Sequence, residues 1–170
     1  MAHIDTKSAL LSEAETLIRT VGYAAFSYAD LSERVGIRKA SIHHHFPTKE
    51  ALGAAVIDAY LERFVAELDL LAKRSASSKR KLVAYGGFFA ASLQDGQMPL
   101  CGALAADAAY LPTSMRQRVR KFFELHLAWL EKILAEGIAA GDINKGQSAK
   151  VFARVLLSTL QGASIVAWVM

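Results

Sequence analysis

Basic, polar and small residues occur together in a short segment of the chain, residues 38–44, and their side chains suit contacts with nucleic acid. Arg38 and Lys39 can bind guanine edges or phosphates, and Ser41 can hydrogen-bond to base edges or to the sugar-phosphate backbone. Ala40 is small enough to let a helix approach DNA closely. We therefore expect a DNA-facing helix that begins near Lys39.

The residues before this helix predict the other half of a helix-turn-helix. Ser27 followed by Asp30 resembles a capping box at the start of a two-turn helix, with Asp in place of the usual Glu or Gln. Gly36 permits the left-handed backbone that a tight turn between helices requires. In a helix-turn-helix the second helix lies in the major groove. Small helical bundles with a polar surface show the same pattern, so these features alone leave both interpretations open.

Apolar residues recur at helical spacing along almost the whole chain, and strand signals are nearly absent. The first helix ends at Gly22, and residues 74–81 are the best candidate for a linker. The later helices are expected at about 48–73, 82–93, 102–109, 113–140 and 147–170. The sequence thus predicts an all-α protein with a three-helix N-terminal domain, a linking helix and a C-terminal helical domain, over residues 1–47, 48–74 and 75–170.

The segment from about Leu10 to Tyr60 resembles the TetR family of bacterial repressors. The matching residues are Gly22-Tyr23, Phe26-Ser27, Asp30-Leu31, Val35-Gly36, Lys39-Ala40-Ser41-Ile42, His44-His45-Phe46 and Lys49-Glu50-Ala51-Leu52. The resemblance implies that the N-terminal helix-turn-helix domain binds double-stranded DNA and that the C-terminal domain binds an effector and dimerises. A homodimer would bind a palindromic operator and leave it when a small molecule binds.

By position, the resemblance also assigns DNA contacts to individual residues. Ser27 would touch a phosphate, and Lys49 would bind another phosphate with help from the dipole of its helix. His43 stands where the family usually has tyrosine, and a histidine that donates to phosphate predicts binding that weakens as pH rises. The predicted DNA-binding residues are Ser27, Tyr28, Arg38, Lys39, Ala40, Ser41, His43, His44 and Lys49.

A second group of residues, in the C-terminal part, has the composition of a small-molecule pocket, namely an apolar wall with few polar groups. The predicted pocket residues are Phe88, Phe89, Leu104, Tyr110, Phe122, His126 and Trp129. His126 is the most informative because it lies between Phe122 and Trp129 at helical spacing. The alternative for each residue is an ordinary place in the hydrophobic core.

Apolar stripes on the last two helices predict the dimer interface, since a palindromic operator needs two recognition helices about one DNA turn apart. The stripes consist of Phe123, Leu127, Leu130 and Leu134, and of Phe152, Val155, Leu156, Leu160 and Ile165. The chain is apolar up to Met170. Either this last helix is buried in an interface or the native protein continues beyond Met170.

Composition and missing motifs argue against other classes of protein. The net charge is +4 and the pI about 9.3, yet residues 1–50 hold six basic and six acidic residues, so a DNA-binding face must arise from placement of charge. Cys101 is the single cysteine, and its apolar neighbours give no charge to activate it as a redox sensor. With no segment of about 18 uncharged apolar residues, we expect a soluble cytoplasmic protein without membrane contact.

No cofactor, metal site or catalytic site is expected. The run His43-His44-His45 cannot converge on one ion, because successive helical residues point about 100° apart. The chain has no nucleophile elbow, phosphate-binding glycine loop or His-Glu-x-x-His pattern. Two alternatives to the ligand-responsive regulator remain, namely a DNA-binding protein without an effector and a helical enzyme.

Overall fold

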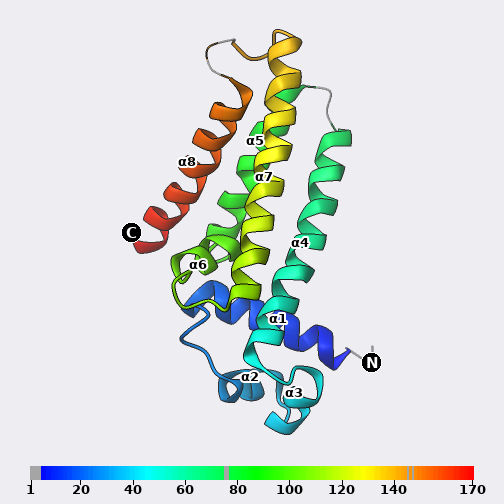
Figure 1. Ribbon diagram of the computed structural model, residues 1–170, viewed down its shortest axis with the longest axis vertical. Helices are drawn as coiled ribbons and strands as arrows, with labels where there is room; N and C mark the ends of the chain where they lie inside the picture. Colours follow the sequence, from blue (N-terminus) through cyan, green and yellow to red (C-terminus); the bar gives the residue numbers. More distant parts are fainter. Residues whose placement is uncertain (1–4, 75–76, 145, 147) are drawn as a thin grey trace. The chain divides into compact units, whose positions relative to one another are not determined.

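The computed structural model describes residues 5–74, 77–144, 146 and 148–170, and every regular element in these ranges is an α-helix (Figure 1). The first four helices are α1 (Thr6–Val21), α2 (Tyr28–Val35), α3 (Lys39–His45) and α4 (Lys49–Arg74). The other four are α5 (Ser78–Gln94), α6 (Leu100–Ala106), α7 (Thr113–Ala139) and α8 (Ala149–Val169). The prediction of an all-α fold is confirmed.

The linker predicted at residues 74–81 is shorter than expected, because α5 already begins at Ser78. Ser78 and Lys81 are both buried, and the Lys81 ammonium lies 3.5 Å from the Glu136 carboxylate on α7. A charged side chain can be buried here because it has this partner. Residues 75 and 76 of the predicted linker lie outside the described residues.

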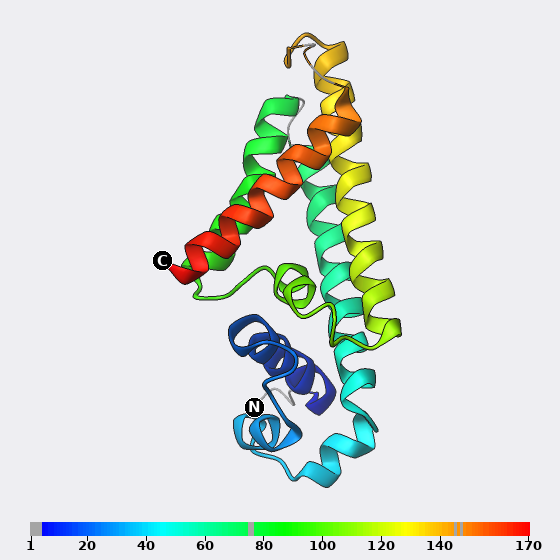
Figure 2. The same ribbon diagram turned by 60° about the vertical axis from the view of Figure 1, so that its left-hand side comes forward.

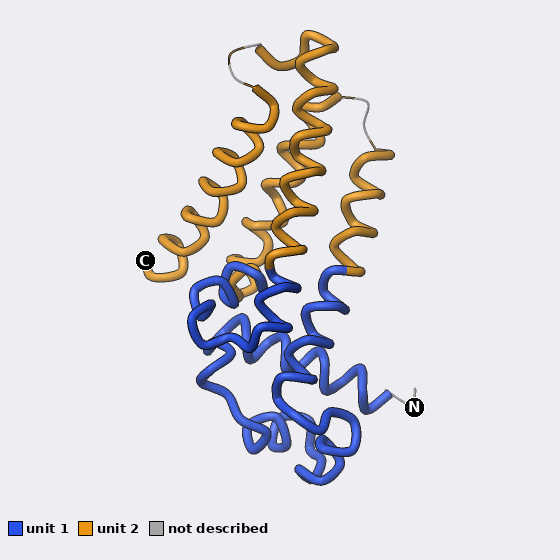
Figure 3. Tube along the Cα trace, viewed as in Figure 1, with its two compact units in different colours: residues 1–61, 100–119 blue, residues 62–99, 120–170 orange. Residues whose placement is uncertain are grey.

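The chain divides into two compact units, which Figure 3 shows in different colours. Unit 1 comprises residues 1–61 and 100–119, and unit 2 comprises residues 62–99 and 120–170. The N-terminal parts of α4 and α7 therefore belong to unit 1 and their C-terminal parts to unit 2. The predicted division into DNA-binding, linking and effector segments concerns function and stays a prediction.

Unit 1 is built around α1, which packs against α2 and α6, while α2 packs against α3 (Figures 1 and 2). The fully buried side chains of this core come from all of its helices. They are Leu10, Ala14 and Ile18 of α1, Leu31 of α2, Ile42 of α3, Leu52 and Ile57 of α4, Leu100 and Leu104 of α6 and Met115 of α7. Helices as short as α2 and α3 are unstable on their own, so packing into this shared core stabilises them.

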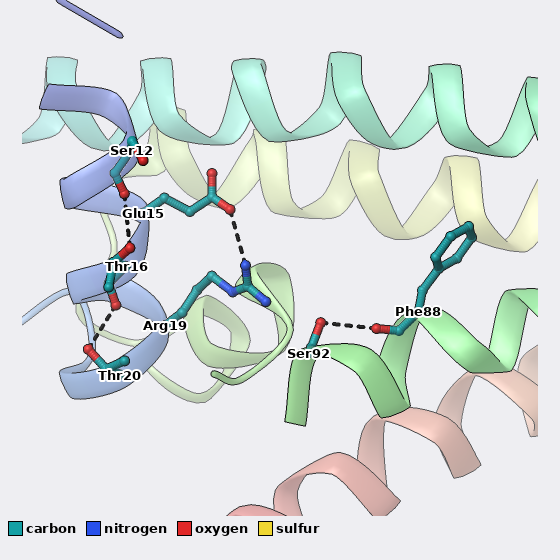
Figure 4. A network of polar contacts seen from close by, with 7 residues as sticks. All are labelled: Ser12, Glu15, Thr16, Arg19, Thr20, Phe88 and Ser92. Carbon is teal, nitrogen blue, oxygen red and sulfur yellow. Dashed lines mark hydrogen bonds and ion pairs between the residues drawn. The ribbon is translucent and has the colours of Figure 1, made fainter. Parts of the chain in front are cut away.

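Polar contacts also join the α6–α7 region to the N-terminal helices within unit 1. The Asp107 carboxylate accepts a hydrogen bond of 3.1 Å from the backbone N–H of Tyr23, in the connection between α1 and α2. The Arg118 guanidinium donates to both carboxylate oxygens of Asp58 at 3.0 Å. Inside α1, Arg19 pairs with Glu15 at 3.2 Å, and the hydroxyls of Thr16 and Thr20 donate to carbonyls one turn earlier (Figure 4). The contacts of Asp107 and Arg118 tie residues 100–119 to the earlier part of unit 1.

Unit 2 contains a core formed by α5, the C-terminal part of α7 and α8, with α5 and α8 in direct contact (Figure 2). Leu130 and Leu134 of α7 are fully buried in this core. Their predicted place in a dimer interface is therefore wrong, because these side chains already pack inside the monomer. Gly137 allows α7 to pack closely, since a Cβ atom there would lie 2.6 Å from Ile143 Cδ1 and 2.8 Å from Ser78 Cβ.

The last helix, α8, exposes many large apolar side chains. They are Val151, Phe152, Val155, Ile165, Val166, Trp168 and Val169, followed by Met170. By length and composition alone, α8 is the one helix of the described residues that could cross a membrane, and 17% of its most apolar stretch is buried. The helix contains Lys150 and Arg154, so the expectation that the chain has no segment of about 18 uncharged apolar residues is not contradicted. A single helix of this kind is weak evidence for a membrane span, because helices of soluble proteins meet the same criteria.

Candidate functional site

The turn between α2 and α3 has the local geometry of a helix-turn-helix. Ser27 caps α2: its hydroxyl accepts from the N–H of Ala29 at 3.1 Å, and its own N–H donates to the Asp30 carboxylate at 2.7 Å. The pKa of Asp30 is below its ordinary value, mainly because Ser27 donates hydrogen bonds to its carboxylate. Gly36 ends α2 at φ 72° and ψ 30°, in the left-handed region. The predicted capping box and glycine turn are confirmed.

The segment 38–44 exposes six of the predicted DNA-binding residues and buries the apolar side that holds α3. Ile42 is fully buried, and Phe46, which ends α3, is also buried. The exposed side chains are Arg38, Lys39, Ala40, Ser41, His43 and His44. The structure thus gathers these residues on one short element, as a recognition helix requires.

Tyr28 and His43 together join α2 to the turn after α3. The Tyr28 hydroxyl donates to the Phe46 carbonyl at 2.9 Å, and its ring meets the His43 ring edge to face with centroids 4.9 Å apart. Burial, helped by Tyr23, raises the pKa of Tyr28 to about 12, so the hydroxyl keeps its proton. His43 Nδ1 lies 3.2 Å from the Pro47 carbonyl, which can only accept. Nδ1 therefore donates, so Nε2 can donate to a DNA phosphate only when the ring is protonated and both nitrogens carry a proton.

Lys49 has an internal role that the sequence does not reveal. Its ammonium donates to the Phe26 carbonyl and lies 4.7 Å and 4.4 Å from the ring centroids of Tyr23 and Phe26. Burial lowers the pKa of Lys49, and the charges of Asp30 and Asp107 act in the opposite direction. Lys49 is the first residue of α4, and through these contacts it stabilises the connection between α1 and α2. Its predicted phosphate contact would have to coexist with these interactions.

Unit 2 contains a cluster of aromatic rings around a buried histidine, His126, which is 2% exposed. Its Nδ1 atom forms a hydrogen bond with the Tyr85 hydroxyl, and its ring stacks on Phe64 with centroids 4.1 Å apart and planes 11° apart. The Phe122 ring is also 4.1 Å away, and Trp129 stacks on Tyr85 at 5.4 Å. Burial lowers the pKa of His126 to about 3, so the imidazole is neutral at physiological pH.

The His126 Nε2 atom is buried and has no hydrogen-bond partner among the described residues. A cavity of about 310 Å³ in the same unit is lined by Glu67, Leu70, Leu71, Arg74, Ala84 and Phe88. The Phe88 ring connects this cavity to the cluster, because its centroid lies 5.8 Å from that of Phe64 and 6.4 Å from that of Tyr85. Figure 4 shows Phe88 on α5, with its carbonyl accepting from the Ser92 hydroxyl at 3.0 Å.

The structure brings five of the seven predicted pocket residues into this cluster: Phe88, Phe89, Phe122, His126 and Trp129. Leu104 is instead buried in unit 1, and Tyr110, also in unit 1, is 79% exposed in the turn after α6. The sequence interpretation missed Phe64 and Tyr85. A signal for Tyr85 was present, since it precedes Phe88 and Phe89 by three and four residues and so lies on the same helical face.

Cys101 lies in α6 with 1% of its surface exposed. Burial raises the pKa of its thiol far above the ordinary value, and the charge of Glu15 adds to this effect. Because the thiolate is the reactive form, a thiol in this setting is poorly suited to redox sensing. Among the described residues, no group of three His, Cys, Asp or Glu side chains is arranged to hold a metal ion.

Comparison with known proteins identifies the family. Residues 10–56 match the sequence profile of "Bacterial regulatory proteins, tetR family". A solved transcriptional regulator of the TetR family from Agrobacterium tumefaciens is 35% identical, with a TM-score of 0.92 over 95% of this chain and 86% of that chain. The chain belongs to the TetR family.

Two further relatives of this TetR-family regulator cover almost its entire length. A TetR transcriptional regulator from Legionella pneumophila is 34% identical, with a TM-score of 0.87 over 99% of this chain and 90% of that chain. The HTH-type transcriptional repressor DhaR of Mycobacterium sp. (strain GP1) is 26% identical over 168 residues, which are 96% of this chain and 82% of that protein. The resemblance found in the sequence is confirmed: the chain is a transcriptional regulator with a helix-turn-helix.

Replacing Lys49 with Met should lower the free energy of unfolding by about 1–2 kcal/mol, because the charged hydrogen bond to Phe26 and the two cation–π contacts are lost. The measurement is urea denaturation. Lys39→Met is a matched control, since Lys39 is also the first residue of its helix but is exposed. Equal stabilities of the two variants would show that Lys49 has no internal role.

The pH dependence of stability should report the buried His126. Below its ordinary pKa of 6.5 the unfolded chain protonates this histidine, whereas the folded chain keeps it neutral down to about pH 3. Acid therefore favours unfolding, and above pH 6.5 the effect vanishes. Between pH 7 and 4.5 the unfolding free energy of the wild type should fall by about 2–3 kcal/mol more than that of His126→Phe. Parallel pH profiles in denaturant titrations would contradict this.

Proposed function

We propose that this TetR-family regulator is a cytoplasmic repressor that binds a palindromic operator as a homodimer and leaves it when a small molecule binds to unit 2. The observation that carries the proposal is the group of exposed polar and basic side chains on α3 and its N-cap. The other side of this helix is buried through Ile42 and Phe46. The proposed DNA contacts, dimer and effector site each rest on further observations.

The proposed DNA contacts combine base readout with anchoring to phosphate. Arg38 stands at the N-cap of α3 and Lys39 in its first turn, the end of a recognition helix that contacts base edges. Ser41 follows on the same exposed surface. Ser27 is a proposed phosphate contact because it lies at the N-terminus of α2, which favours anions. His43 is the other, in its protonated form, in which Nε2 donates while Nδ1 stays on the Pro47 carbonyl. Because residues 1–50 carry no net charge, these few side chains would supply the attraction.

The proposed dimer would bury the apolar face of α8. A continuous row of exposed apolar side chains along one helix of a soluble protein is typical of a protein–protein interface. Val155 and Val166 are 56% and 63% exposed, although both belong to a regular helix whose opposite side packs in unit 2 through Ala153 and Leu157. The two-fold symmetry of such a dimer would present two copies of α3 to the two halves of a palindrome.

The proposed effector site is the aromatic cluster of unit 2 with its adjoining cavity. The cavity, at about 310 Å³, has the size of a small-ligand site, and its lining combines the apolar residues Leu70, Leu71, Ala84 and Phe88 with the charged residues Glu67 and Arg74. A regulator without an effector would use the same residues only as core. The relatives are transcriptional regulators, and we propose no catalytic step.

Arg38→Ala should weaken binding to the operator by roughly ten- to hundredfold, because one base or phosphate contact per subunit is removed. Fluorescence anisotropy would be measured with the DNA upstream of the protein's own gene and with a scrambled duplex. Arg120→Ala is the charge-matched control, since this arginine is exposed on α7 and pairs with Glu124 at 2.8 Å. Equal losses in both variants, or no loss in either, would contradict the assignment of α3 as the recognition helix.

Val155→Glu should convert the dimer to a monomer, since a carboxylate on the α8 face would be buried without a partner. Sedimentation velocity would give the mass in solution. Val83→Glu places the same charge on α5 at a residue that is 78% exposed and should leave the dimer intact. A wild type that sediments as a monomer, or a Val155→Glu variant that remains dimeric, would remove α8 as the interface.

A further inference from the structure

The connection between α1 and α2, residues 22–27, is held in place by side chains from later parts of unit 1. The Asp107 carboxylate accepts a hydrogen bond of 3.1 Å from the backbone N–H of Tyr23, and the Lys49 ammonium donates to the Phe26 carbonyl. Tyr23 and Phe26 are both buried, with ring centroids 6.2 Å apart. The path of the connection therefore depends in part on Asp107, which lies 84 residues after Tyr23.

Gly22 gives the Asp107 carboxylate room to approach the backbone. Its φ of 91° and ψ of 156° lie in a region that essentially only glycine adopts. A Cβ atom at this position would lie 3.2 Å from Asp107 Oδ2, closer than side chains normally approach. Because Oδ2 is also the atom that accepts from Tyr23, the glycine and the carboxylate form one local arrangement.

The chemistry of this contact makes it sensitive to loss of the carboxylate. An ionised acceptor forms a stronger hydrogen bond than a neutral one, and a backbone N–H in a buried residue is costly to leave unpaired. Burial lowers the pKa of Lys49, and the negative charges of Asp30 and Asp107 act against this effect. Asp107 thus supports the connection through its own hydrogen bond and also favours the charged form of Lys49.

The connection leads directly into the proposed DNA-binding surface. Ser27, which follows Phe26, is the N-cap of α2 and a proposed phosphate contact. The next residue, Tyr28, donates from its hydroxyl to the Phe46 carbonyl at the end of α3, at 2.9 Å. A displacement of the connection would therefore move Ser27 and, through Tyr28, the end of α3 as well.

Resting on the operator binding proposed above, we infer that Asp107 is a positioning residue for DNA. By accepting from the Tyr23 N–H, its carboxylate sets where the N-terminus of α2 stands when the protein meets its operator. Asp107 acts through the connection and requires no contact with DNA. Its negative charge alone would weaken the attraction to phosphate, so the positioning role and the charge have opposite effects on affinity.

Asp107→Ala should weaken operator binding by about tenfold, a factor of roughly three for each subunit of the dimer, as expected for one lost hydrogen bond. Fluorescence anisotropy with the upstream DNA and a scrambled duplex gives both affinities. Removal of an acidic charge alone predicts the opposite sign. Asp95→Ala is the charge-matched control, because Asp95 is exposed at the C-cap of α5, and it should not weaken binding to either duplex.

The conservative variant Asp107→Asn separates the hydrogen bond from the charge. Its amide oxygen can still accept from the Tyr23 N–H, so operator affinity should stay within about threefold of the wild type. A role through charge alone would make the Asn and Ala variants behave alike. Wild-type operator affinity in Asp107→Ala, equal changes in the two variants, or an equal loss on the scrambled duplex would each overturn the inference.

A second measurement needs no variant and covers the case in which Asp107→Ala fails to fold. In ¹⁵N-labelled wild-type protein, the Tyr23 amide should exchange with solvent much more slowly than in an unfolded chain, because it is bonded to Asp107. Operator DNA should slow this exchange further, since bound DNA favours the positioned connection. An unprotected amide, or one whose exchange the operator leaves unchanged, would contradict the role of Asp107.

These outcomes are distinct from failure of the proposed function. A wild type that binds its operator specifically, with Asp107→Ala binding as tightly, would keep the repressor proposal and remove only the positioning role. A wild type that binds the upstream and scrambled duplexes equally would remove the proposed operator binding itself, and the positioning role with it.

Discussion

Helices as short as α2 and α3, with eight and seven residues, do not persist alone in water, so their attachment to the rest of unit 1 is the constraint on which the DNA-facing surface depends. Leu31 and Ile42 provide it by complete burial, and Phe46 closes the end of α3. The exposed residues Arg38, Lys39 and Ser41 can then be chosen for contact with DNA, because they are not part of this buried core.

Local features of the site were predictable from sequence, whereas contacts between distant segments were not. Ser27, Asp30 and Gly36 act on neighbours within a few residues, so their roles follow from spacing alone. Lys49 binds a carbonyl 23 residues earlier, and Tyr85 meets His126 across 41 residues. Nothing in the helical periodicity fixes such pairings, because the relative rotation of two helices decides them.

The same limit explains the mixed outcome for the apolar residues. Periodicity correctly placed α4, α7 and α8, yet an apolar stripe does not say whether it faces its own core or a partner. Leu130 is buried within the monomer, whereas Val155 remains exposed. Tyr110 has an aromatic side chain but follows α6 in a turn, where no second helix covers it. The fold class was therefore easier to predict than the residues that line a pocket.

The buried thiol of Cys101 has a practical consequence. It is the only cysteine of the chain, it lies in α6, and almost none of its surface is accessible. A thiol reagent can reach it only during excursions that open the packing around α6, a helix that lies against α1. The rate of alkylation therefore reports how often these rare openings occur in the native protein, without any engineered label.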